Sequence, residues 1–262
     1  MNFQDRIVWI TGASSGIGEA LAYAFHRAGA RLILSARRED ELQRVQAACG
    51  GEPNARVLPL DVSRGDELAG KARAALSLFG GIDILVLNAG ISQRSLARNT
   101  DESVYRRLME VNFFGPEVLT RAVLPAMLEK KSGHIVVISS IAGKFGVPLR
   151  TGYSATKFAL HGFYEALRAE EGRHGICVTL VCPGYVHTGI SVAALKGDGS
   201  KHAKMDPELA QGMPAEECAR QILLGVARKK QEIVVGATRE KTLVLLKRFF
   251  PAMLARMIGR SG

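Results

Sequence analysis

Short runs of apolar, mostly β-branched residues recur along the chain, and each is long enough for one strand of a sheet. The runs are apolar at nearly every position rather than at alternate positions, so they predict strands buried on both faces, as in a parallel sheet. These runs lie at residues 7–10, 32–34, 57–60, 82–87, 135–138, 178–181 and 233–235.

Helix-like segments with small or polar residues at their ends separate these runs. They lie at residues 19–28, 40–48, 66–78, 102–130, 154–171 and 215–229. This alternation predicts an α/β fold: a doubly wound, Rossmann-type parallel sheet of seven strands with helices on both faces. Since no linker, internal repeat or low-complexity stretch interrupts it, we expect residues 1–262 to form a single domain.

Two segments depart from the alternation. Residues 187–213 are rich in Gly, Lys and His and lack strong periodicity, which is typical of a long functional loop, and we interpret them as a substrate loop. Residues 239–262 form an apolar and basic tail that Pro251 should break.

The composition is that of an ordinary globular protein, with 47% hydrophobic and 23% charged residues, and it excludes a disordered chain. No apolar run reaches the ~18 residues of a membrane-spanning helix. The first ten residues lack the basic and long apolar regions of a secretory signal, so we expect a cytoplasmic protein. The six histidines do not pair at metal-ligand spacing and the four cysteines form no CxxC pair, so we expect no metal.

The net charge of +10 is concentrated at the end of the chain. Six basic side chains and one acidic side chain give residues 239–262 a charge of +5. Such a tail can pack in the core or at a subunit interface, cap a pocket, or make peripheral contact with an anionic membrane. We expect no nucleic-acid partner, because charge alone without a recognised binding module is weak evidence.

A glycine-rich turn follows the first predicted strand and precedes a helix. It reads Thr11-Gly12-Ala13-Ser14-Ser15-Gly16-Ile17-Gly18. Glycines allow the sharp turn and a close approach of the backbone to a pyrophosphate, which then lies on the free N–H groups of the helix N-terminus. The turn therefore predicts a dinucleotide site.

The residues after the second strand bear on the choice of dinucleotide. They read Ser35-Ala36-Arg37-Arg38, without the carboxylate that would accept from the ribose 2′-hydroxyl of NAD. Arg37 and Arg38 suit a 2′-phosphate, so we predict NADP(H) rather than NAD(H). The alternative is that both arginines are surface charges at the start of the next helix.

A series of short motifs follows the glycine turn along the chain. With the turn itself, they are Thr11 to Gly18, Asp61-Val62, Asn88-Ala89-Gly90, Asn112, Ser140, Tyr153-Ser154-Ala155-Thr156-Lys157 and Pro183-Gly184 with Thr188. In these motifs and in their order the chain resembles the short-chain dehydrogenase/reductases. In the segments 35–38 and 92–95 it resembles, within that family, the NADP-dependent group called member 7.

The resemblance implies a catalytic set. Tyr153 would protonate the carbonyl oxygen, Lys157 would also bind the nicotinamide ribose, and Ser140 would donate to the same oxygen. Asn112 would hold a water that relays protons to Lys157. Since Gly115 and Pro116 follow Asn112 closely, we expect the helix to kink there.

The resemblance also implies the cofactor contacts. Asp61, next to Val62, would accept from the adenine amino group, and Asn88, Ala89 and Gly90 would line the adenine ribose. A further set, beside Tyr153 and Lys157, would cover the nicotinamide: Pro183, Gly184, Val186 and Thr188.

The spacing of Tyr153 and Lys157 adds a physical argument. They are four residues apart in a predicted helix and share one face. A phenol titrates near pKa ~10. We expect the neighbouring ammonium to lower the pKa of Tyr153 toward neutral pH, where a general acid/base works best.

The substrate pocket is expected around Ser140, Ala142, Phe145, Tyr153 and Tyr185, between the segments 92–96, 142–149 and 185–213. Apolar side chains there favour a hydrophobic carbonyl or alcohol, such as a lipid, steroid or oxoacyl chain. They are Phe145, Val147, Leu149, Tyr185 and Val192.

The sequence therefore predicts an NADP(H)-dependent oxidoreductase that interconverts a carbonyl and a secondary alcohol, in a homodimer or homotetramer of the resembled kind. Two alternatives stay open. One is an NAD(H)-preferring alcohol dehydrogenase, and the other is a sensor or scaffold protein that binds NADPH without turnover.

Overall fold

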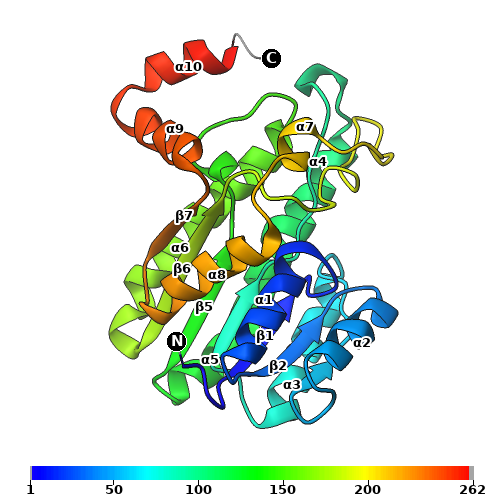
Figure 1. The fold of residues 1–262 in the computed structure, drawn as a ribbon, viewed down its shortest axis with the longest axis vertical. Helices are drawn as coiled ribbons and strands as arrows, with labels where there is room; N and C mark the ends of the chain where they lie inside the picture. The colour runs from blue at the N-terminus through cyan, green and yellow to red at the C-terminus, as the bar shows by residue number, and fades with distance from the viewer. Residues whose placement is uncertain (1, 260–262) are drawn as a thin grey trace.

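A computed structural model describes residues 2–259 of the chain. Seven parallel strands form one sheet in the order β3-β2-β1-β4-β5-β6-β7, with helices on both faces (Figure 1), which confirms the predicted fold class. The strands are β1 Ile7–Thr11, β2 Arg31–Ser35, β3 Ala55–Val57, β4 Ile84–Leu87, β5 Gly133–Ile138, β6 Ile176–Pro183 and β7 Glu232–Val235. The helices are α1 Gly16–Arg27, α2 Glu39–Ala48, α3 Gly65–Phe79, α4 Glu102–Met109, α5 Gly115–Glu129, α6 Thr151–Glu171, α7 Pro207–Ala210, α8 Ala215–Ala227, α9 Thr238–Phe249 and α10 Pro251–Gly259.

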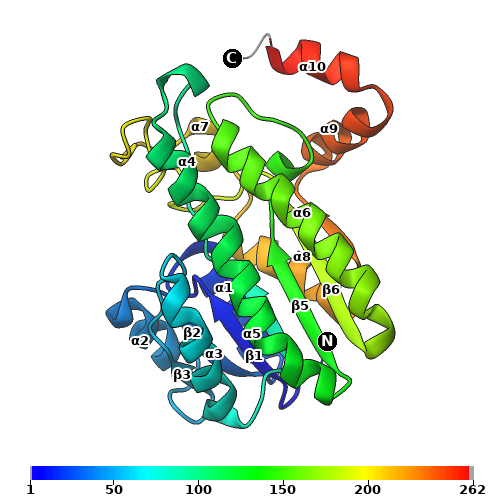
Figure 2. The ribbon, with the colours of Figure 1, turned by 180° about the vertical axis from the view of Figure 1, so that it is seen from behind.

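The sheet separates two apolar cores. Along β1, Val8 and Ile10 enter one core while Trp9 enters the other, because successive side chains of a strand point to opposite faces. One core lies under α1, α2 and α8, and the other lies under α3, α5 and α6 (Figure 2). Burial on both faces explains why the strands are apolar at consecutive positions.

One predicted strand was placed wrongly. The expected strand at 57–60 is observed as β3, Ala55–Val57, at the edge of the sheet. Two hydrogen bonds continue the pairing beyond it, from Leu58 N to Leu34 O at 2.9 Å and from Leu60 N to Ala36 O at 2.9 Å. Pro59 lies between these donors and has no N–H to offer, which is tolerated at an edge.

The long segment predicted at 102–130 is interrupted, as expected from Gly115 and Pro116. The interruption is a π-helical stretch, Glu110–Phe114, between α4 and α5. Such bulges are rare and occur often at functional sites. It contains Asn112, and Pro116 follows at the start of α5.

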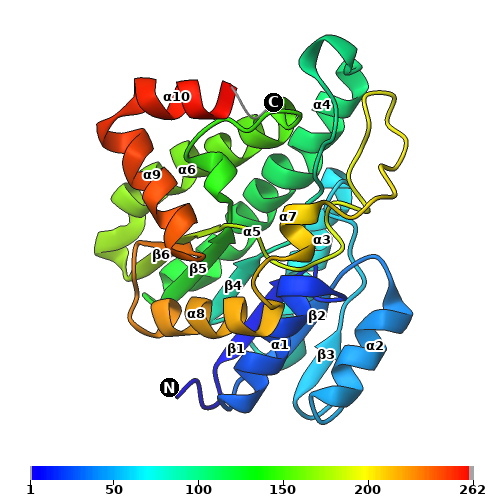
Figure 3. The ribbon, with the colours of Figure 1, turned by 45° about the horizontal axis from the view of Figure 1, so that its top comes forward.

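The tail forms two helices that meet at Pro251, the first residue of α10. Both helices lie beyond the carboxyl ends of the strands, with α10 at the outer end of the molecule (Figure 3). Arg260, the last basic residue of the predicted tail, lies outside the described residues. Within residues 2–259, each helix is too short or too polar to span a lipid bilayer.

Candidate active site

The glycine turn connects β1 to α1 in a tight conformation. Gly12 and Gly16 adopt φ angles of 68° and 59°, which favour glycine. A Cβ atom on Gly18 would lie 2.2 Å from the carbonyl oxygen of Gly12, so only glycine permits this approach. The Ser15 side chain makes no capping bond to α1, which leaves the first N–H groups of the helix for a ligand.

Asn88 fastens this turn to the end of β4. Its Nδ2 atom donates to the carbonyl oxygens of Thr11 at 3.0 Å and Gly12 at 3.2 Å. The backbone N–H of Asn88 donates to the hydroxyl of Thr11 at 3.0 Å, and the N–H of Ala89 does so at 3.2 Å. Asn88 therefore holds the ends of two neighbouring strands together beneath the turn.

Two arginines follow β2, and they have different neighbours. Arg38 donates from Nη2 to the hydroxyl of Ser14 in the glycine turn, at 3.4 Å. The charge of Arg37 acts instead on Asp61, which precedes Val62. Burial raises the pKa of the Asp61 carboxyl, but hydrogen bonds from Ser63 and the charges of Arg37 and Arg64 outweigh burial and lower it. Arg38, rather than Arg37, is the guanidinium in contact with the turn.

Tyr153 lies in the first turn of α6 and is buried, with 7% of its surface exposed. Its hydroxyl is hydrogen-bonded to Ser140. Ser140 follows β5 and also accepts from the N–H of Ala142 at 3.1 Å, which fixes the turn that holds it. The neighbouring Ser139 hydroxyl points instead to the carbonyl oxygen of Lys157, at 3.4 Å.

Lys157 lies one helical turn beyond Tyr153 and is also buried. Its Nζ atom donates to the carbonyl oxygen of Ile138 at 2.8 Å and lies 5.5 Å from the centre of the Tyr153 ring. Burial lowers the pKa of Lys157 to about 8, against the opposing influence of Cys182.

The expectation that Lys157 lowers the pKa of Tyr153 is wrong. Burial raises the pKa of the phenol above its ordinary value. The bond to Ser140 and the charges of Arg150 and Arg94 act in the opposite direction without overcoming burial. The cations that favour the phenolate are therefore two arginines on the pocket side of the ring.

Asn112 is fully buried in the π-helical stretch. Its Oδ1 atom accepts from Ile91 N at 2.9 Å, and its Nδ2 atom donates to Ile91 O at 2.9 Å and to the Thr156 hydroxyl at 3.0 Å. A Cβ atom on Gly90 would lie 3.2 Å from Asn112 Oδ1 and 3.8 Å from Lys157 Nζ, so both side chains border the same glycine.

A cavity of about 310 Å³ joins these groups. Its walls contain the five residues around which the substrate pocket was expected, namely Ser140, Ala142, Phe145, Tyr153 and Tyr185. Part of the expected cofactor set also lines it: Ile17, Asn88, Gly90, Lys157, Pro183, Gly184, Val186 and Thr188. Thr188 lies against the glycine turn, 3.1 Å from where a Cβ of Gly16 would be. The cavity therefore continues into the dinucleotide site.

Two expected pocket residues lie elsewhere. Leu149 and Val192 are 43% and 38% exposed and do not line the cavity, because both point to solvent from loops. Phe145, Val147 and Tyr185 do line it.

Sequence reasoning missed a buried ion cluster in the cavity wall. Asp206, in the 187–213 loop, forms ion pairs with two arginines. One is Arg94, whose side chain is 7% exposed, and the other is Arg150, with 3.1 Å between its Nη2 and Asp206 Oδ2. The Asp206 N–H donates to the Ser191 hydroxyl at 3.1 Å. Asp206 therefore holds the loop against the body of the protein, and no local motif could have revealed a pair 112 positions apart.

Gln93 positions the start of α6, the helix that carries Tyr153 and Lys157. Its Oε1 atom accepts from the N–H groups of Gly152 at 2.7 Å and Tyr153 at 3.4 Å, which α6 cannot satisfy internally. Its Nε2 atom donates to the hydroxyls of Ser95 at 3.1 Å and Thr100 at 3.2 Å.

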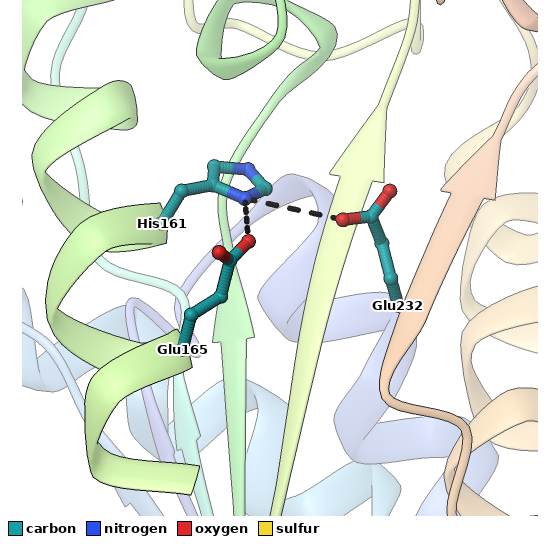
Figure 4. A group of neighbouring side chains, drawn as sticks. All are labelled: His161, Glu165 and Glu232. Atoms are coloured by element: carbon teal, nitrogen blue, oxygen red, sulfur yellow. Dashed lines mark hydrogen bonds and ion pairs between the residues drawn. The ribbon is translucent and has the colours of Figure 1, made fainter. Parts of the chain in front are cut away.

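A second cluster braces α6 further along (Figure 4). His161 Nδ1 lies 3.4 Å from Glu165 Oε1 and 4.0 Å from Glu232 Oε2, on β7. Lys144 is bonded to Glu232, and His161 Nε2 lies 3.5 Å from the Cys182 sulfur. The Lys144 ammonium pairs with Glu232, and Glu165 is exposed to solvent, so we interpret the cluster as a link between α6 and β7.

The fold and the site together define a protein of the class that binds a dinucleotide at the carboxyl ends of a doubly wound sheet. The short chain dehydrogenase family model matches residues 6–198, and the chain belongs to the short-chain dehydrogenase/reductase family of oxidoreductases.

The chain groups with the member 7 branch of this family. It is 40% identical over 265 residues to the dehydrogenase/reductase SDR family member 7B of Danio rerio, covering 98% of this chain and 86% of that protein. It is 41% identical over 264 residues to the human family member 7, covering 98% and 78%.

Solved structures show the same fold. A short chain dehydrogenase/reductase of Burkholderia phymatum in complex with NAD is similar with a TM-score of 0.83 and 25% identity, covering 95% of this chain and 94% of that one. Binding of a nicotinamide dinucleotide is supported by this relationship, whereas the choice between NAD(H) and NADP(H) is a separate question.

Proposed function

We propose that the protein is an NADP(H)-dependent oxidoreductase that interconverts a carbonyl and a secondary alcohol on a hydrophobic substrate. The observation that carries this proposal is the buried Tyr153 hydroxyl, bonded to Ser140 at the wall of the cavity and followed one turn later by Lys157. A proton donor, an oxygen-binding hydroxyl and a cation thus lie on one cavity wall.

The glycine turn fits the pyrophosphate of the cofactor, since a Cβ on Gly18 would fill the space that the turn needs. Arg38, in contact with Ser14, would bind a 2′-phosphate, with Arg37 beside it. Asp61 and the segment at Asn88, Ala89 and Gly90 would take the adenosine half. When bound, the dinucleotide supplies or accepts the hydride.

The protein's own groups then handle the oxygen and the proton. The Ser140 hydroxyl donates to the carbonyl oxygen and stabilises the charge that develops there. Tyr153 gives its proton to the same oxygen as a general acid. Burial raises the pKa of this phenol, so Tyr153 is held in the protonated form that reduction of a carbonyl requires.

Arg94 and Arg150 assist after the proton has left. Their charges favour the phenolate form of Tyr153, and both line the cavity. Lys157, whose Nζ atom donates to the carbonyl oxygen of Ile138, is a further proton-bearing group in the cavity wall.

The cavity composition supports a hydrophobic substrate. Apolar side chains from three parts of the chain line it, including Phe145, Ile190 and Leu243. Apolar walls with a few fixed polar groups are typical of sites for small organic molecules.

Assembly as a homodimer or homotetramer is part of this proposal. Phe114, in the π-helical stretch, and Phe158, on α6, are 43% and 44% exposed. Exposed aromatic side chains on these helices support pairing through them.

The test is the oxidation of NADPH and NADH with a panel of lipid, steroid and small ketones. Tyr153→Phe should lower kcat by about 100-fold or more while leaving dinucleotide binding intact. Tyr164→Phe, on the same helix but outside the cavity, is the matched control and should retain turnover. Equal turnover of the Tyr153 variant and the parent would show that the tyrosine is not the acid.

A further inference from the structure

The hairpin formed by α9 and α10 contributes part of the cavity wall. Leu243 and Met257 line the cavity, and Leu254, only 1% exposed, packs with Ile141 and Phe145. The hairpin therefore caps the pocket, one of the roles that the tail sequence left open.

The outer face of the same hairpin is apolar and exposed. Eleven large apolar side chains are exposed in the described part of the chain, and five of them lie within residues 245–257. These five are Leu245 at 57%, Phe249 at 65%, Phe250 at 62%, Met253 at 55% and Met257 at 47%. A patch this dense, on helices at the outer end of the molecule (Figures 1 and 2), marks an interaction surface.

The exposed charges of the hairpin have one sign. Between residues 239 and 259 the exposed charged side chains are all cationic: Arg239, Lys241, Lys247, Arg248 and Arg256. The single carboxylate, Glu240, is 7% exposed and lies against Gly184, with 2.5 Å between its Cγ and the position of a Cβ there. The partner of this surface must therefore be both apolar and anionic.

A second copy of the chain meets only half of this requirement. A twofold contact pairs a surface with itself, so two hairpins would bring their cations together. An anionic lipid bilayer offers acyl chains to Phe249 and Phe250 and negative headgroups to the cations around them.

We propose that the α9–α10 hairpin docks on an anionic membrane surface and that hydrophobic substrate enters the cavity along it. Met257 is 47% exposed on the outer surface of the hairpin and also lines the cavity. A ligand can therefore pass from the membrane-facing surface into the cavity across this one side chain. The entry of substrate rests on the proposed function, whereas the docking does not.

Cosedimentation with vesicles tests the docking without turnover. The full chain should bind phosphatidylcholine vesicles that contain phosphatidylserine at least about tenfold more tightly than pure phosphatidylcholine vesicles, and salt should weaken this binding. The double variant Phe249→Ser/Phe250→Ser should lose about tenfold or more of the affinity. Lys241→Glu/Arg248→Glu should remove the preference for the anionic lipid.

Two matched controls keep this test specific. Leu149→Ser removes an exposed apolar side chain that lies outside the hairpin and does not line the cavity, and Arg73→Glu reverses an exposed charge on α3. Both variants should bind vesicles like the parent. Circular dichroism and turnover of a small water-soluble ketone check that each variant is folded.

Three results would overturn docking: no binding to anionic vesicles, equal binding by the double phenylalanine variant, or dissociation of an oligomer by that variant with no vesicle binding. The last result would assign the surface to a second copy. Tyr153→Phe should still bind vesicles, so loss of the proposed activity and loss of docking are distinguishable.

Discussion

The ammonium group of Lys157 is fixed to the carbonyl oxygen of Ile138, 2.8 Å away, at the end of β5. Ser140 follows the same strand two residues later. One strand end therefore fixes the cation on the helix and carries the hydroxyl that bonds Tyr153. Any shift of β5 moves both groups together.

This placement predicts a pH dependence. Burial holds the pKa of Lys157 at about 8, so the ammonium is present below that pH and is lost as the pH rises through it. We expect kcat/KM for ketone reduction to fall above about pH 8. Lys157→Arg, which stays charged, should remove this fall even at a lower absolute rate, whereas an unchanged profile would exclude Lys157 as its source.

Arg38 should determine the preference for NADPH. Its bond to Ser14 places a guanidinium beside the glycine turn. Arg38→Ala is expected to weaken NADPH binding by about tenfold or more and to change NADH binding little. Arg37→Ala is the informative comparison, because the charge of Arg37 acts on the Asp61 carboxyl whereas Arg38 bonds to the turn, so its effect on NADPH should be smaller. Fluorescence titration of both dinucleotides measures this, and equal losses for the two coenzymes would contradict it.

Gly18 should be irreplaceable in the turn. A Cβ there would meet the carbonyl oxygen of Gly12 at 2.2 Å and Asn88 Nδ2 at 2.5 Å, so Gly18→Ala must displace the turn. We expect dinucleotide binding to be lost and the melting temperature to fall. Gly65→Ala, at the start of α3 with open space around it, should instead leave binding intact and stabilise the protein by about 0.5 kcal/mol.

The carboxylate of Asp206 should hold the 187–213 loop closed. Asp206→Asn removes the carboxylate that forms ion pairs with the buried Arg94 and the half-buried Arg150. We expect a loss of about 3 kcal/mol of unfolding free energy and faster proteolysis within the loop. Asp198→Asn, in the same loop but exposed, should change neither. Urea unfolding with mass mapping of the cleavage sites distinguishes the two variants.

The sequence was sufficient for the groups whose neighbours are local. The spacing of four residues places Tyr153 and Lys157 on one face of a helix, whereas Ser140 was identified through the family resemblance. The strand near Val57 was misplaced because an edge strand loses the burial that marks the others, and Pro59 interrupts its donors.

The long-range features could not be predicted. Arg94 and Asp206 are an unexceptional arginine and aspartate in the sequence, and only the folded loop brings them together. The Tyr153 pKa was misjudged for a related reason: a spacing of four residues reveals the neighbouring lysine but not the depth of burial, and burial has the larger effect.

The capping of α6 by Gln93 bears on how such an enzyme could acquire new specificities. Gln93, in the loop after β4, fixes the start of α6. Its own partners, Ser95 and Thr100, are close to it in sequence. Residues 207–259 contribute nothing to that cap. The pocket residues that this segment supplies, Leu209, Arg239, Leu243, Met257 and Ile258, can therefore be redesigned for a different substrate without removing the cap that orients Tyr153.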